Sequence, residues 1–219
     1  MTKISFELAG LTLLEPMAFI LNWVLMIQAW FYFSRLKNRN SSTFSSSWRW
    51  FFLIFGISGC FGGVSHLLYN YTGVPGKFPG WLAAIVAVSL MEFAMVSLAE
   101  GKLRKGLQYL VGTKLVVSAT LLILYLNFTV VMIHSSVMGL FLLVPSLLYL
   151  VKGRSELSYF LIGALTLVAS LPFKLLAIDF HLWFNRDDIG HIFMMMALYC
   201  FYKGVLVHES NPDPAIKPA

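Results

Sequence analysis

The chain has 219 residues, of which 58% are hydrophobic and only 12% are charged. A soluble domain carries about 25% charged residues, so the composition excludes an ordinary soluble protein and indicates a polytopic membrane protein. The formal net charge of +6 could attract nucleic acid. The basic residues, however, stand in short segments between apolar runs, a pattern that orients membrane proteins. We therefore expect no nucleic-acid partner.

Seven apolar runs follow one another, each compatible with a spanning helix of about 20 residues. They cover residues 9–33, 48–69, 81–99, 107–128, 129–151, 157–178 and 189–205. The stretch 107–151 is too long for one span, so it must turn near Asn127. None of the runs alternates apolar and polar residues as membrane strands do. The sequence predicts an all-α bundle of seven transmembrane helices over 1–207, and a short disordered cytoplasmic tail over 208–219.

The distribution of lysine and arginine predicts the orientation of the bundle. Basic residues follow the first, third, fifth and seventh runs: Arg35, Lys37, Arg39, Arg49, Lys102, Arg104, Lys105, Lys152, Arg154 and Lys203. The other connections carry only Lys77 and Arg186, with Lys174 close by. The positive-inside rule places the N-terminus outside and the C-terminus in the cytoplasm. In a bacterial host we expect the cell membrane.

With this orientation, four of the five histidines and four acidic residues fall near the outer edge of the bundle. They are His66, His134, His181, His191, Glu15, Asp179, Asp187 and Asp188. Ionisable groups near hydrocarbon are costly, and their gathering at one depth predicts a functional site.

Spacing within this set suggests metal binding. Asp187 and His191 are separated by four residues and share a helix face, and Asp188 with His191 forms the alternative pair. Either carboxylate could bind a metal or orient the imidazole. His66 follows a run of small residues that leaves room for close helix packing. Helix capping by Asn185, Asp187 and Asp188 is the simpler interpretation of the acidic pair.

Two ionisable residues lie deeper in the predicted spans. Glu92 is near the middle of the third run. Lys114 lies about two turns inside the fourth, and we expect its long side chain to reach the cytoplasmic interface.

Three segments carry a resemblance to a known superfamily. The first is Gly-Ile-Ser-Gly-Cys-Phe-Gly-Gly-Val-Ser-His, ending at His66. The second is Ile-Asp-Phe-His-Leu-Trp-Phe at 178–184, and the third is Asp-Asp-Ile-Gly-His-Ile-Phe-Met-Met-Met-Ala-Leu-Tyr at 187–199. Together with the seven spans, they resemble the hydrolases that include alkaline ceramidases and adiponectin receptors. The resemblance implies three zinc-binding histidines, a serine and an aspartate in the site, and hydrolysis of amide bonds in membrane lipids.

The chain departs from that pattern at three positions. Asp187 stands where the final helix of the family has its first histidine, and Gly62 replaces the serine that precedes the second-span histidine. Position 77 is lysine where an acidic residue is expected.

The leading hypothesis is a zinc-dependent hydrolase acting on a lipid-like amide or ester at the outer side of the bilayer. His66, His191 and one of Asp187, His181 or His134 would supply the three protein ligands of a catalytic zinc site. Glu15 or Asp179 would act as general base. Membrane lipids are the expected partners.

Two other classes of protein remain open. One is a non-enzymatic seven-span protein, such as a transporter, sensor or accessory subunit. The other is a haem protein in which His66 and either His134 or His191 are the axial ligands.

Overall fold

The structure, a computed structural model, describes residues 4–36, 42–153, 155 and 157–210. Seven helical segments of this part are long and apolar enough to cross a membrane, which confirms the predicted number of spans. They are α1 (Pro16–Arg35), α2 (Thr43–Leu67), α4 (Phe78–Val96), α5 (Gly101–Tyr125), α6 (Phe128–Val151), α7 (Ser158–Ala169) continued by α8 (Leu171–Leu175), and α9 (Arg186–Ser210). A short helix α3 (Tyr69–Thr72) and a 3-10 turn (Pro75–Lys77) connect α2 to α4.

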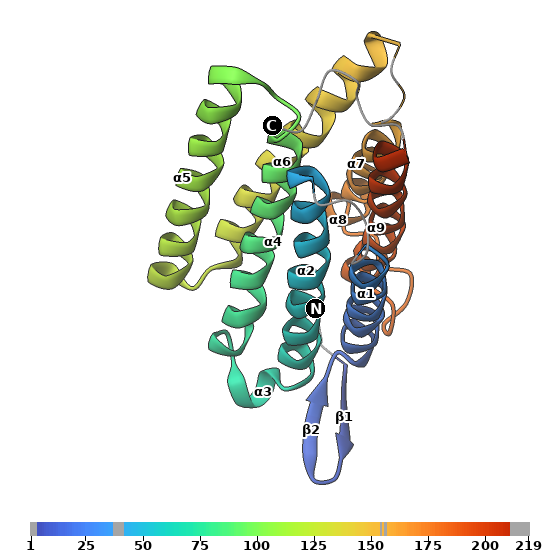
Figure 1. Cartoon of the computed structure of the whole chain (residues 1–219). Helices are drawn as coiled ribbons and strands as arrows, with labels where there is room; N and C mark the ends of the chain where they lie inside the picture. Colours follow the sequence, from blue (N-terminus) through green and yellow to red (C-terminus); the bar gives the residue numbers. More distant parts are fainter. Residues whose placement is uncertain (1–3, 37–41, 154, 156, 211–219) are drawn as a thin grey trace.

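Six of the spans form a closed ring, in which α1 packs on α2, α2 on α4, α4 on α6, α6 on α7, α7 on α9, and α9 on α1. The helix α5 lies outside this ring, at the edge of the bundle, where it packs on α4 and α6 (Figure 1). Only three of its residues, Val111, Ser118 and Leu122, are buried.

The chain begins with a β-hairpin that the sequence analysis did not predict. Strands β1 (Ser5–Leu8) and β2 (Leu11–Leu14) pair in antiparallel register, and the hairpin projects from one end of the bundle (Figure 1). Ala9 and Gly10 between them both have positive φ, 51° and 77°, as tight hairpin turns require. The first span therefore begins at Pro16 and not at residue 9, with proline in the first helical turn, where its missing N–H costs nothing.

At the other terminus, α9 continues to Ser210. The first three residues of the predicted tail are therefore helical, and the remainder of the tail lies outside the described residues.

Aromatic side chains fill the bundle at the end opposite the hairpin. The fully buried Trp48 lies 4.9 Å from the ring of Phe160 and 5.3 Å from that of Phe201. Glycines make room for these rings, since a Cβ at Gly204 would lie 2.7 Å from Phe160. This packing joins α2, α7 and α9.

Glycines of α2 also bring α1 close, as the small-residue run before His66 predicts. A Cβ at Gly59 would lie 2.9 Å from the carbonyl oxygen of Asn22, and one at Gly63 would lie 2.8 Å from the Trp23 ring. Such close approach is characteristic of small residues in membrane helices. It places the last turn of α2 beside the start of α1.

Candidate functional site

Glu15 and His66 meet at the hairpin end of the bundle. Glu15 precedes α1 with a φ of 50°, and its backbone N–H donates to the carbonyl of Ile4 at 3.0 Å, so the hairpin holds it in place. Its Oε2 lies 2.7 Å from Nδ1 of His66, in the last turn of α2. Because a carboxylate accepts hydrogen bonds, Nδ1–H of His66 donates, and Nε2 is the nitrogen left for another ligand.

His191 lies on the first turns of α9, and both of its ring nitrogens have partners. Nδ1 donates to the carbonyl of Asp187 at 2.7 Å, and Nε2 lies 2.9 Å from Nδ2 of Asn22. The same amide nitrogen donates to the carbonyl of Ala18, which fixes the amide orientation. His191 is therefore held as the neutral tautomer with Nε2 as acceptor.

Asp188 is buried, and its two oxygens have different environments. Oδ2 accepts the backbone N–H of Asn185 at 2.9 Å. Asn185 in turn accepts the N–H groups of Asp187 and Asp188. The predicted capping role is therefore confirmed for Asn185 and Asp188, as a reciprocal arrangement, whereas the Asp187 side chain pairs with Lys174. Capping does not account for Oδ1, which is buried without a hydrogen-bond partner among the described residues.

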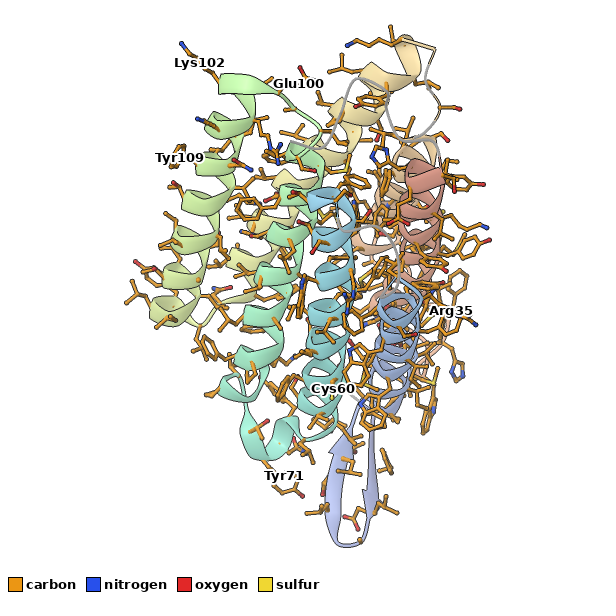
Figure 2. The ribbon with its side chains drawn as sticks, in the orientation of Figure 1. Arg35, Cys60, Tyr71, Glu100, Lys102 and Tyr109 are labelled. Carbon is orange, nitrogen blue, oxygen red and sulfur yellow. The ribbon has the colours of Figure 1, made fainter. Side chains whose placement is uncertain are left out.

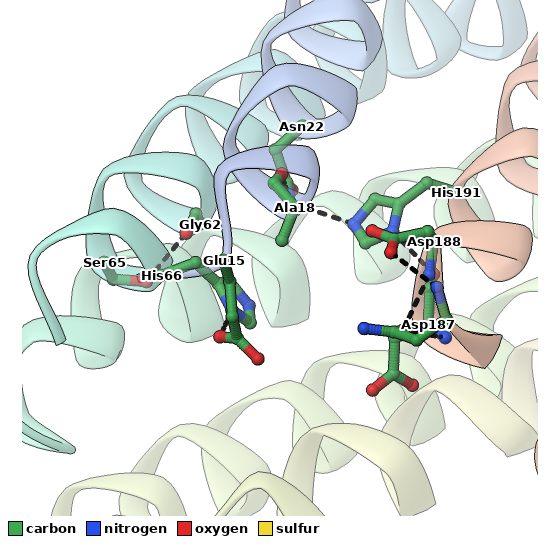
Figure 3. Close-up of polar contacts among 10 residues, drawn as sticks. Glu15, Ala18, Asn22, Gly62, Ser65, His66, Asp187, Asp188 and His191 are labelled. Carbon is green, nitrogen blue, oxygen red and sulfur yellow. Dashed lines mark hydrogen bonds and ion pairs between the residues drawn. The ribbon is translucent and has the colours of Figure 1, made fainter. Parts of the chain in front are cut away.

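These side chains face one another from three helices (Figure 3). Glu15 and His66 lie on one side, Asp188 and His191 on the other, and Asn22 reaches towards His191. We call this set of five residues the hairpin-end cluster.

Two members of the cluster, Glu15 and Asp188, line a cavity of about 370 Å³. The cavity is walled by the start of the chain, the beginning of α1, and the loop between α8 and α9, including Ile4, Glu15, Met17, His181, Trp183 and Asp188. A cavity of this size lies within the range of small-ligand sites.

The other predicted site residues lie around or away from this cluster. Asp187 points outward and pairs with Lys174 at 3.3 Å, so its side chain is turned from the gap that Asp188 faces. His181 lies in the exposed loop and borders the cavity. His134 belongs to a separate buried cluster on α4, α5 and α6.

Asp179 is tied to Arg186 in the loop that borders the cavity. Its Oδ1 accepts from the backbone N–H and Nε of Arg186, and its Oδ2 accepts from Nη2 at 2.9 Å. These side-chain hydrogen bonds, followed by the backbone one, lower the pKa of the Asp179 carboxyl below its usual value. An ionised carboxylate held in this way is a poor general base.

The serines near His66 are engaged with the backbone. Ser58 donates to the carbonyl of Gly80 at 2.9 Å and Ser65 to that of Gly62 at 2.8 Å. The resemblance implies a serine hydroxyl near the second-span histidine, and Gly62 stands at that position. Neither Ser58 nor Ser65 replaces this hydroxyl, because both donate to backbone carbonyls.

Sequence reasoning missed Asn22 as a member of the site. It lies on α1, seven residues after Glu15, which directly precedes that helix. A buried amide on an apolar helix, two turns from a carboxylate, was the available signal.

The prediction that Lys114 reaches the cytoplasmic interface is wrong. Its Nζ donates to Oε1 of the fully buried Glu92 and to the carbonyl of His134. The imidazole of His134 lies between the hydroxyls of Ser118, at 2.9 Å, and Ser89, at 3.2 Å. We call these five residues the intramembrane cluster.

Seven apolar helices, most of them in a ring around polar groups, define a multi-pass membrane protein. The chain belongs to a family described as a family of unknown function (DUF6962), whose model matches residues 17–209. The match thus covers all seven spans. No curated protein and no solved structure matches the chain.

Proposed function

We propose that the protein is a membrane hydrolase that cleaves a lipid-like amide or ester at the hairpin-end cluster. One observation carries the proposal: the buried, unpartnered Oδ1 of Asp188, which lines a cavity, lies in a cluster with the imidazole of His191 on the same helix and that of His66 on α2. A buried carboxylate oxygen without a partner is costly unless a cation or proton compensates it. Such a concentration of titratable groups around a cavity is typical of reaction sites.

The donor chemistry of the cluster suits zinc, which binds imidazole nitrogen and carboxylate oxygen. His66, His191 and Asp188 would hold the ion. In the described part of the chain, however, no three His, Cys, Asp or Glu side chains are close enough to hold a metal as they stand. Binding therefore requires that Nε2 of His191 leave Asn22. When bound, zinc would supply Lewis acidity towards a substrate carbonyl or a water.

The chain's own residues would position the zinc ligands and deprotonate the attacking water. Glu15 holds the Nδ1 proton of His66 and so directs Nε2 into the gap. We assign it the general-base role in preference to Asp179, because the guanidinium of Arg186 lowers the pKa of the Asp179 carboxyl and so weakens it as a base. Asn22 stabilises the acceptor tautomer of His191.

The loop that borders the cavity favours a substrate from the bilayer. Its large apolar residues Phe180, Leu182 and Trp183 are 66%, 64% and 48% exposed, and all three border the cavity. Exposed aromatic side chains at a span boundary are typical of the membrane interface. The basic connections at the opposite end support an orientation with the hairpin end outside, in the cell membrane of a bacterial host. With this orientation the substrate would come from the outer leaflet.

A second candidate is a seven-span protein that binds a polar lipid headgroup without hydrolysing it. The observation in its favour is that both ring nitrogens of His191 already have protein partners. A haem with His134 as axial ligand is less well supported, because the two ring nitrogens of that residue lie against serine hydroxyls.

The adjacent acidic residues of α9 provide a matched test. Purified protein in detergent would be analysed for bound metal, and for hydrolysis of a fluorescent N-acyl lipid amide and its ester counterpart. We expect about one zinc ion per chain, lost in Asp188→Asn and His66→Gln but retained in Asp187→Asn, with hydrolysis following the metal. Folded, metal-free protein without hydrolysis would contradict the proposal, and headgroup binding by that protein would favour the second candidate.

A further inference from the structure

The intramembrane cluster is independent of the hairpin-end cluster and contains one unsatisfied atom. Oε1 of Glu92 accepts from Lys114, whereas Oε2 is buried without a hydrogen-bond partner in the described part of the chain. His134, by contrast, has a hydroxyl at each ring nitrogen. The titratable groups that meet here are Glu92 from α4, Lys114 from α5 and His134 from α6. Of these three, Glu92 alone has an acceptor atom that is not used.

A buried ion pair of this kind has a narrow margin of stability. Removing both charges from water costs about as much free energy as their mutual attraction returns. The bare oxygen of Glu92 adds to that cost. Ionisable residues at such a depth are functional candidates by default.

The same contacts hold α5 on the bundle. The helix packs on α4 and α6, at the edge of the bundle. Two of its polar side chains, Lys114 and Ser118, reach Glu92 and His134. Docking of α5 therefore depends on the polar contacts of this cluster as well as on the burial of Val111 and Leu122.

We propose that Glu92 is a proton-binding site inside the bundle and that its protonation releases α5 from α4 and α6. One proton from the aqueous phase adds to Oε2 of Glu92, and the charge of the pair changes from zero to +1. The ion pair is then lost. The ammonium of Lys114, whose side chain is 15% exposed, extends towards the polar interface and withdraws its hydrogen bond from His134.

The sign of the pH dependence follows from this step. The attraction between Glu92 and Lys114 is present while Glu92 is ionised, and it disappears as the pH falls and the carboxylate takes up a proton. Acid therefore favours the undocked position of α5.

Spin labels on α5 and α2 would measure the docking. Both positions are exposed: Tyr109 points away from the bundle (Figure 2) and Ser46 lies at the start of α2. The labels would be attached at Tyr109→Cys and Ser46→Cys, with Cys60 and Cys200 replaced by alanine, in phosphatidylcholine nanodiscs. We expect a narrow distance distribution at about pH 8 and a longer, broader one at about pH 5.

Variants of the pair separate protonation from other effects of acid. Glu92→Gln and Lys114→Met should give the longer distribution at both pH values, and the exchange Glu92→Lys with Lys114→Glu should restore the short one at about pH 8. Glu100→Gln removes an exposed carboxylate before α5 (Figure 2) and should behave as its parent. Identical distributions at both pH values in the parent, or a folded Glu92→Gln protein that still responds to acid, would overturn the proposal.

Discussion

At the cavity border, Asp179 and Arg186 link the two ends of one loop through a bidentate ion pair. Because the folded-state pKa of Asp179 is lowered by Arg186, the pair stabilises the loop above the usual aspartate pKa. This contribution is lost as the pH falls through the lowered value. Arg186→Gln should raise the pKa of Asp179 towards its usual value of 3.8, measured by carbon NMR of the labelled carboxyl. Lys174→Met, which removes the partner of Asp187 instead, should leave it unchanged; an unchanged pKa in Arg186→Gln would contradict this assignment.

Single residues show where sequence reasoning about the site stopped. Spacing favoured Asp187 as the ligand candidate on α9 and gave Asp188 as the alternative partner of His191, because positions three and four residues before His191 share a face. The structure separates them: Lys174 draws Asp187 outward, whereas Asp188 turns inward through its bond to Asn185. That choice depends on α8 and on the loop, neither of which is visible in the local pattern.

At the scale of an element, the contact between α7 and α9 depends on small residues. A Cβ at Gly204 would lie 2.7 Å from the buried ring of Phe160. Close-packed aromatic rings have little space to move away from an added methyl group. Gly204→Ala should therefore reduce the free energy of unfolding by about 1–3 kcal/mol through overpacking, which a lower midpoint of thermal unfolding would show.

A matched glycine provides the control for this substitution. Gly139 lies within α6, and a Cβ added there would have no neighbouring atom within 4 Å. Gly139→Ala should leave the midpoint unchanged or raise it slightly, because alanine is the better helix former. Equal midpoints for the two variants would show that the α7–α9 contact adjusts without cost.

The elements themselves were largely predictable, since each span obeys a local rule of length and apolar content. The exception was the hairpin. Residues 9–14 are as apolar as the span that follows them, so composition alone does not separate the hairpin from α1. The chain turns at Ala9 and Glu15, where φ is positive. In the sequence, only the adjacent Gly10 and Pro16 indicate these turns.

At the scale of the whole molecule, the ring and the peripheral α5 could not be predicted. Residues that face lipid and residues that face a neighbouring helix are equally apolar. Hydropathy therefore does not indicate which helices are neighbours. Glu92 and Lys114, both within predicted spans, carried a charge-based hint, and their pairing across α4 and α5 explains why Lys114 does not extend to the interface.

The orientation of the whole bundle gives the last prediction. Val74, beside α3 at the hairpin end, is 38% exposed, and Lys102, at the start of α5, is exposed at the other end. Because loop lysines and arginines favour the cytoplasm, a cysteine at Val74→Cys should react with a membrane-impermeant maleimide on intact cells. Lys102→Cys should react only after permeabilisation, in the same Cys60→Ala and Cys200→Ala background. The reverse pattern would place the hairpin-end cluster in the cytoplasm and would move the proposed substrate to the inner leaflet.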